Sequence, residues 1–161
     1  MGKRGQKLFA GLPVAILIVL IALLLSSCAL PKIVVMEDKL TAEQHNDLGF
    51  VYEQKGIFDL AEKEYLLAVK KRKDWQVPYF TLGNLAFKMG DYKKSENFFH
   101  TVLKYDSNNS DVMNNLANAL LMQGRHREAR QMIEQALRIE KKEEYLDTLG
   151  TIQKSENAAT H

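Results

Sequence analysis

The chain has 161 residues, of which 46% are apolar and 26% charged, and it contains only three prolines. This length and composition predict one folded domain with a short additional segment and exclude a chain that is disordered throughout. The formal net charge is +2, but without Lys3, Arg4 and Lys7 the chain has 19 basic against 20 acidic residues. A nearly neutral body lacks the basic surface that nucleic acids require, so we expect no nucleic-acid partner.

Residues 1–27 have the pattern of a targeting signal. Their basic start is followed by an apolar run over residues 8–25 and then by small residues. The end of this segment, Leu-Ser-Ser-Cys at residues 25–28, resembles the bacterial lipobox. The resemblance implies that signal cleavage leaves Cys28 as the first residue and that its thiol carries a covalent lipid of the diacylglycerol and palmitate type. Because Cys28 is the only cysteine, no disulfide within the chain competes for its thiol.

Residues 28–41 are then the lipidated cysteine and a tether. In enterobacteria an aspartate after the lipidated cysteine retains such a protein at the inner membrane, and this chain has Ala29 there. We therefore expect a lipid-anchored protein at a bacterial cell membrane, facing the periplasm, with the outer membrane favoured over the inner one. No cofactor is expected apart from the lipid on Cys28.

Two alternatives for the N-terminal segment stay open. The apolar run of 18 residues over 8–25 corresponds to roughly 27 Å of helix, which barely spans the hydrocarbon core of a bilayer. It is also longer than the apolar part of a typical signal, which favours an uncleaved transmembrane anchor. Ordinary signal cleavage after Ala29 would instead release the body into the periplasm. An intact Met1 in the mature protein would contradict the lipoprotein interpretation.

The body of the chain shows an internal repeat. Five sets of residues recur every 34 positions, and five sets in phase at one period are not expected by chance. The sets are Leu48, Leu82 and Leu116; Gly56, Gly90 and Gly124; Ala61, Ser95 and Ala129; Tyr65, Phe99 and Ile133; and Ala68, Val102 and Ala136.

Each repeat unit has the features of two antiparallel helices joined by a turn. Apolar residues recur at helical spacing on both sides of the glycine set, and glycine can end a helix in the left-handed conformation. Small residues such as Gly49 and Ala61 let the paired helices approach closely, and the large residues of the Tyr65 set fill the space between successive pairs. The first helix begins with a capping box formed by Thr41 and Gln44.

This pattern resembles the tetratricopeptide repeat, a helix–turn–helix unit of 34 residues. The resemblance implies an all-α fold, a short α-solenoid of three repeats, with a C-terminal helix that covers the last apolar face. We place the domain at residues 42–156 and a mobile tail at 157–161. The repeats are 42–75, 76–109 and 110–142, and the capping helix is 143–154.

The sequence contains no arrangement that predicts catalysis. The four histidines (His45, His100, His126 and His161) are scattered, and no two of them lie at the spacing of metal ligands. His45 and His126 occupy repeat positions that usually hold an aromatic residue, so we expect them to pack. The chain has no phosphate-binding loop and no nucleophile motif. We expect no enzyme activity, no metal site and no small-molecule substrate.

In the tetratricopeptide repeat family the first helices of successive units line a concave groove, which implies a partner-binding site here. Asparagine costs roughly 0.5 kcal/mol in a helix relative to alanine, yet several of them crowd the third unit's first helix. Their amides can hold the backbone of an extended chain, and phenylalanines can anchor its side chains. The candidate residues are Asn46, Phe50, Phe80, Asn84, Phe87, Asn114, Asn115 and Asn118, with Asp47, Glu53, Thr81 and Leu121 beside them.

Two observations qualify this prediction. Asparagine and aromatic residues are common at these positions across the family, which leaves a purely architectural role open. Some family members bind C-terminal carboxylates with a clamp of lysine and asparagine, and Asn46 and Phe50 occupy two places of that clamp. A receptor of that kind is therefore not expected.

By analogy with small tetratricopeptide lipoproteins of this build, we therefore predict a membrane-anchored scaffold or assembly factor of the bacterial cell envelope that binds protein partners. The alternatives are an inner-membrane bitopic adaptor and an accessory subunit of an envelope enzyme complex.

Overall fold

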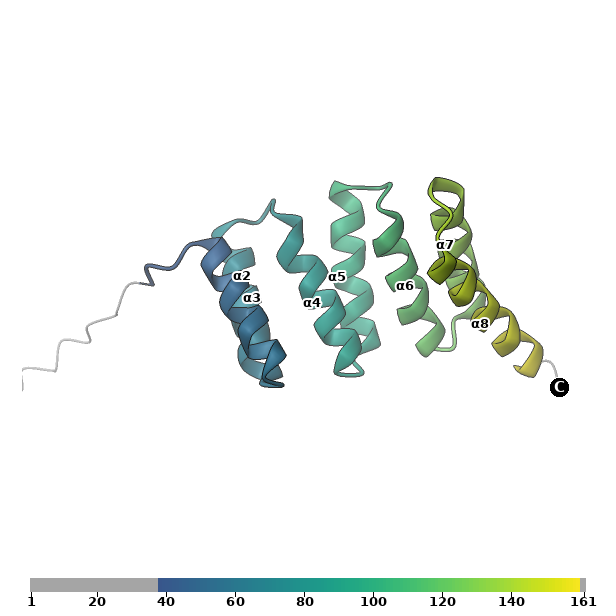
Figure 1. The fold of residues 1–161 in the computed structure, drawn as a ribbon, viewed down its shortest axis with the longest axis horizontal. Coiled ribbons are helices and arrows are strands. Elements are labelled where there is room, and N and C mark those ends of the chain that lie inside the picture. The colour runs from purple at the N-terminus through teal and green to yellow at the C-terminus, as the bar shows by residue number, and fades with distance from the viewer. Residues whose placement is uncertain (1–37, 160–161) are drawn as a thin grey trace, which may run out of the picture. The chain divides into compact units, whose positions relative to one another are not determined.

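The computed structural model describes residues 38–159, and within this range all regular structure is helical. Three helical hairpins lie side by side and an additional helix follows the third (Figure 1). This arrangement confirms the predicted all-α solenoid of three repeats with a capping helix. The helices are α2 (Ala42–Gln54), α3 (Phe58–Lys71), α4 (Gln76–Lys88), α5 (Tyr92–Tyr105), α6 (Ser110–Met122), α7 (His126–Ile139) and α8 (Glu143–Ala159).

The predicted lipid site at Cys28 and the apolar run over residues 8–25 lie outside the described residues. Within residues 38–159, none of the helices combines the length and the apolar character needed to cross a membrane.

The first helix of each repeat begins at the predicted boundary, at Ala42, Gln76 and Ser110. The predicted capping box is present, because Thr41 Oγ1 accepts from the Gln44 amide at 3.2 Å and Gln44 Oε1 accepts from the Thr41 amide at 2.8 Å. These two bonds satisfy amides that the helical ladder leaves unpaired. They fix where the first repeat starts.

Each hairpin turns at its glycine. Gly56, Gly90 and Gly124 have φ angles of 72°, 81° and 73°, in the left-handed region that side chains with a Cβ disfavour. After each glycine, the next amide donates to a carbonyl five residues back, as Ile57 does to Tyr52 at 2.9 Å. The three turns are therefore equivalent corners, as the 34-residue period predicts.

The interior of each hairpin pairs a small residue with a large one. A Cβ atom added to Gly83 would lie 2.5 Å from Cε1 of Phe99, so the two helices of the second repeat approach too closely for any side chain there. Gly49 stands against Tyr65 in the same way in the first repeat. Tyr65 also belongs to an apolar cluster with Leu82 of the next repeat, so the large residues join neighbouring repeats as predicted.

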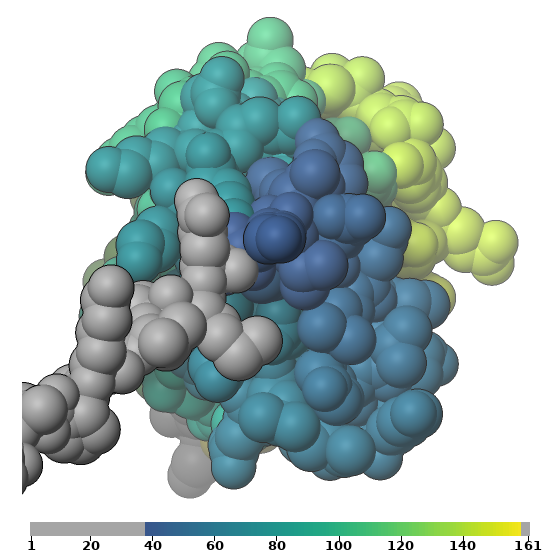
Figure 2. Space-filling model, turned by 90° about the vertical axis from the view of Figure 1, so that its left-hand side faces the viewer, coloured from purple at the N-terminus to yellow at the C-terminus, as the bar shows by residue number. Residues whose placement is uncertain are grey.

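The row of hairpins ends in α8. Tyr145 and Ile152 on this helix have no exposed surface, and both belong to the same apolar cluster as residues of α6 and α7. The opposite end of the row is formed by α2 and α3, whose surfaces face the viewer in Figure 2.

One predicted boundary was wrong. The capping helix was expected to end at Lys154 and a mobile tail to begin at residue 157, but α8 continues to Ala159. The physical reason is that residues 155–159 contain no proline or glycine to stop the helix, and alanine is the strongest helix former.

Candidate protein-binding groove

The first helix of each repeat and α8 contribute side chains to one surface, which we call the groove face. It consists of the residues at the second, fifth, sixth and ninth positions of α2, α4, α6 and α8. They are Glu43, Asn46, Asp47 and Phe50; Val77, Phe80, Thr81 and Asn84; Asp111, Asn114, Asn115 and Asn118; and Glu144, Asp147, Thr148 and Thr151. Contacts described below connect these positions from α4 to α8.

A cavity of about 230 Å³ opens on the groove face between α4 and α6. Its apolar wall includes Phe80, whose ring lies 6.2 Å from that of Phe99, and Val77, which is 45% exposed. Asn109 and Asp111 add polar groups to the same cavity. An apolar pocket with a few polar groups around it is the usual form of a site that receives a side chain or a small ligand.

Asparagine amides make contacts between and within α4 and α6 further along these helices. Asn115 Nδ2 donates to Asn84 Oδ1 at 3.0 Å, which joins α6 to α4. Asn118 Nδ2 donates to the carbonyl of Asn114 one turn earlier at 3.2 Å. Asn84, Asn115 and Asn118 are all half-buried, so each side chain keeps part of its surface accessible to a partner.

Asn114 and Asn46 differ from these three. Asn114 is only 5% exposed and its Nδ2 donates to Glu144 on α8 at 3.4 Å, so this amide connects helices and offers little surface to a partner. Asn46 is half-buried, and among the described residues nothing donates to its Oδ1.

The three predicted phenylalanines have different environments. Phe50 is 54% exposed on α2 and open to a partner. Phe80 is half-buried and forms part of the cavity. Phe87, one turn beyond the groove face, packs edge-on against Tyr92 of the same hairpin, with ring centroids 5.3 Å apart.

The groove face carries acidic charge and no basic residue at its sixteen positions. Asp111 accepts from Lys142 Nζ at 2.7 Å and from the Tyr145 hydroxyl at 2.5 Å, and these hydrogen bonds lower the pKa of its carboxyl. Asp47 and Asp147 are exposed and have no ion pair with any described residue. Lys142, which directly precedes α8, pairs with Asp111 from outside these positions, and Arg72 pairs with Glu43.

Sequence reasoning missed the residues around the mouth of the cavity. Gln76, Val77 and Asp111 stand at the start of α4 and α6, and none of them was a predicted site residue. The available signal was the repeat register, since Val77 and Asp111 share the second position of their helices.

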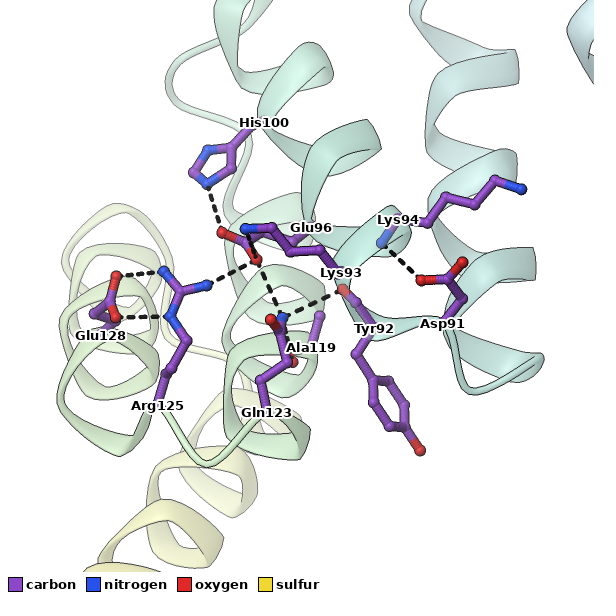
Figure 3. Close-up of polar contacts among 10 residues, drawn as sticks. All are labelled: Asp91, Tyr92, Lys93, Lys94, Glu96, His100, Ala119, Gln123, Arg125 and Glu128. Carbon is purple, nitrogen blue, oxygen red and sulfur yellow. Dashed lines mark hydrogen bonds and ion pairs between the residues drawn. The ribbon is translucent and has the colours of Figure 1, made fainter.

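A buried ion-pair network lies on a different part of the second and third repeats (Figure 3). Glu96 on α5 is 4% exposed and accepts from Arg125 at 2.7 Å, Lys93 at 3.0 Å and Gln123 at 3.1 Å. Burial acts to raise the pKa of this carboxyl, but the hydrogen bonds from Arg125, Lys93 and Gln123 outweigh it and lower the pKa to about 2. Lys93 lies on α5 itself, whereas Gln123 and Arg125 lie in the turn between α6 and α7. The network therefore connects repeat two to repeat three.

The predicted packing of histidines can be examined at His45. His45 is 2% exposed and its Nδ1 lies 2.7 Å from a Glu64 carboxylate oxygen, which agrees with the predicted packing role. Across residues 38–159, no group of three or more His, Cys, Asp or Glu side chains is arranged to hold a metal ion.

Comparisons with known proteins agree with this architecture. The tetratricopeptide repeat family matches residues 86–151. The human tetratricopeptide repeat protein 6 is 29% identical over 82 residues, which cover 51% of this chain and 16% of that protein. The chain therefore corresponds to less than a fifth of the length of this relative.

Solved structures share the fold. The first TPR domain of Spaghetti (RPAP3), bound to the HSP90 peptide SRMEEVD, has a TM-score of 0.68 at 16% identity, over 75% of this chain and 97% of that one. The second TPR domain of human RPAP3, in complex with the HSP70 peptide SGPTIEEVD, has a TM-score of 0.66 at 18% identity, over 70% and 94%. The Sgt2 TPR domain from Aspergillus fumigatus has a TM-score of 0.68 at 13% identity, over 74% and 81%.

The equivalent corners, the paired small and large residues and the capping helix define an all-α helical repeat protein. The tetratricopeptide repeat family matches residues 86–151 of it, and solved tetratricopeptide repeat domains share the fold of the described residues.

Proposed function

We propose that this protein is a membrane-anchored scaffold or assembly factor of the bacterial cell envelope, which holds an extended segment of a partner protein on its groove face. The observation that carries the binding role is the cavity between α4 and α6, together with the half-buried amides of Asn84, Asn115 and Asn118 further along the same two helices. A peptide side chain in the cavity and peptide backbone on the amides would use both features at once.

The solved neighbours support peptide binding by this fold but not the same kind of peptide. Two of them hold the peptides SRMEEVD and SGPTIEEVD, which are acidic at their ends. This chain has Asn46 and Phe50 in two places of the carboxylate clamp, and no lysine or arginine on the groove face. We therefore infer a partner segment other than an acidic C-terminal tail.

The second part of the proposal is that a lipid on Cys28 anchors the protein to a membrane. The lipobox-like residues 25–28 and the single cysteine favour a lipid on Cys28, so that the repeats face the periplasm. A single acyl chain binds a membrane only marginally, and a diacylglycerol with a further fatty acid would anchor it stably. Catalysis plays no part in this proposal.

The binding half is tested with a partner captured by crosslinking from membranes of the native host and then purified. Asn84→Ala with Asn118→Ala should weaken its binding roughly fivefold to thirtyfold, from about 1 kcal/mol for each lost hydrogen bond. The matched control is Asn97→Ala with Gln131→Ala, which removes two exposed amides from α5 and α7. Equal affinity for both double variants would refute a role for the groove amides.

The anchoring half is tested by mass spectrometry of the mature N-terminus. A lipidated Cys28 as the first residue is the expected result. An intact Met1 would overturn the lipoprotein interpretation and favour the bitopic adaptor. If the dominant captured partner is an envelope enzyme, the accessory-subunit alternative gains support.

A further inference from the structure

We infer that the partner segment is basic, with an apolar side chain that enters the cavity between α4 and α6 and lysine or arginine residues on both sides of it. This inference rests on the proposed function and specifies the chemistry of the partner. It follows from the position of the acidic residues relative to the cavity.

The cavity selects the central residue of the segment. Its wall contains Val77, Phe80, Val102 and Val112, all aliphatic or aromatic. An interior apolar cavity of roughly 150 Å³ is large enough to bind benzene, so about 230 Å³ accepts a leucine, methionine or phenylalanine side chain. An acidic side chain there would lose its hydration and meet the like charge of Asp111, and a basic one would compete with Lys142 for that carboxylate.

The flanks of the cavity select the charge of the neighbouring residues. Acidic side chains stand on both sides along the row of helices, with Asp47 on α2 and with Glu144 and Asp147 on α8. Asp111 lies at the cavity itself, although Lys142 already neutralises part of its charge. An acidic segment laid across this face would meet like charges on both sides, whereas a basic one would meet its complement.

The free carboxylates make this complementarity available. Asp47 and Asp147 are exposed and unpaired within the described residues, so a partner cation need not displace an existing ion pair. At the usual spacing of roughly 8–10 Å between neighbouring helices, the three steps from α2 to α8 span roughly 24–30 Å, and a nine-residue extended segment reaches roughly 30 Å.

The probes are three fluorescein-labelled nine-residue peptides with leucine at the centre. They carry two lysines, two glutamates or two serines on each side, and all other residues are serine or glycine. Binding to the full-length chain is measured by fluorescence anisotropy. We expect the lysine peptide to bind more tightly than the serine peptide, and the serine peptide more tightly than the glutamate peptide. Added salt should reduce this spread, since it screens exposed charges.

Matched variants locate the charge effect. Asp47→Asn with Asp147→Asn should weaken the lysine peptide roughly threefold to tenfold, as two exposed ion pairs allow, and should leave the serine peptide unchanged. The control, Asp59→Asn with Asp74→Asn, removes the same charge from exposed residues off the groove face and should have no effect beyond the measurement error. Val77→Trp, which fills the mouth of the cavity, should weaken all peptides that bind.

The outcomes separate the two proposals. If the three peptides bind equally, or the glutamate peptide binds best, and Val77→Trp still weakens them, the charge inference is overturned and the groove remains a binding site. If no peptide binds at millimolar concentration, or Val77→Trp changes nothing, the inference and the proposed binding site both fail. An equal loss in both aspartate double variants would also overturn the inference, because general charge would then explain the preference.

Discussion

Inside the hairpins, Tyr65, Phe99 and Ile133 have no exposed surface, whereas on the groove face Phe50 is 54% exposed and Val77 45% exposed. Tyr65 and Phe99 pack against Gly49 and Gly83 of the paired helix, and Tyr65 also packs against Leu82 of the next repeat. The groove face instead presents amides, carboxylates and open apolar side chains over a cavity. The difference indicates that one part of the 34-residue period specifies the fold and another part is free to specify a partner.

The largest expected effect is the loss of an interior ring. Phe99→Ala should lower the free energy of unfolding by about 4 kcal/mol, because it removes a fully buried side chain and leaves a cavity beside Gly83. Urea unfolding followed by circular dichroism measures the loss. A decrease in the free energy of unfolding of less than about 1 kcal/mol would show that the Phe99 ring is not a major packing contact of the second hairpin.

Adding volume at the same joint should cost less. Gly83→Val places a Cβ within 2.5 Å of the buried Phe99 ring, which must then shift, and overpacking of this kind costs roughly 1–3 kcal/mol. In a Phe99→Leu background the same substitution should cost less, since a smaller side chain stands opposite. Additive effects in the double variant would contradict direct contact between the two positions.

The ion-pair network between repeats two and three should make stability depend on pH. The pKa of Glu96 is about 2 in the folded chain, below its ordinary value of 4.5, because hydrogen bonds from Arg125, Lys93 and Gln123 outweigh the opposing effect of burial. A lowered folded-state pKa stabilises the fold above pH 4.5, and this contribution is lost as the pH falls from 4.5 towards 2. Between pH 4.5 and 3 the loss is roughly 2 kcal/mol.

Glu96→Gln isolates this contribution from the other carboxylates. The variant should be less stable than the original chain at pH 7, and the difference should shrink at pH 3. Chemical unfolding at the two pH values measures both differences. A constant difference would mean that Glu96 is already protonated at pH 7 or that its ion pairs do not stabilise the fold.

The smallest effect on stability is expected on the groove face. Asn84→Ala should change the free energy of unfolding by less than about 0.5 kcal/mol, since the lost hydrogen bond to Asn115 is offset by the better helix propensity of alanine. A thermal unfolding curve checks this. A loss above 2 kcal/mol would place Asn84 among the residues that hold the repeats together and would support the architectural role that family composition leaves open.

The fold was largely predictable because residues that specify the helices and turns recur every 34 positions in the sequence. Gly56, Gly90 and Gly124 required a left-handed corner, and the corners fixed where each second helix begins. The end of α8 was predicted too early, although the residues after Lys154 contain no proline or glycine that would stop a helix before Ala159.

The candidate site was predictable only in part. The repeat register placed Phe80 and Asn84 on the first helix of the second repeat, but the cavity that Phe80 lines depends on the separation of α4 and α6, which no spacing in the sequence reports. Asn114 was predicted as a partner contact. Because α8 packs beside α6, the side-chain amide of Asn114 instead donates a hydrogen bond to Glu144. Packing between elements, not the pattern within one, decided both cases.

The most direct test of the central claim is a map of where a bound segment lies. The full-length chain, labelled with ¹⁵N, is titrated with the lysine peptide and its amide resonances are followed by NMR. We expect the perturbed amides to cluster on α4 and α6 around Val77 and Asp111, while the exposed side of α3 around Lys63 stays unchanged. Perturbations centred on α3, or spread evenly over all helices, would contradict the claim that the groove face is the binding surface.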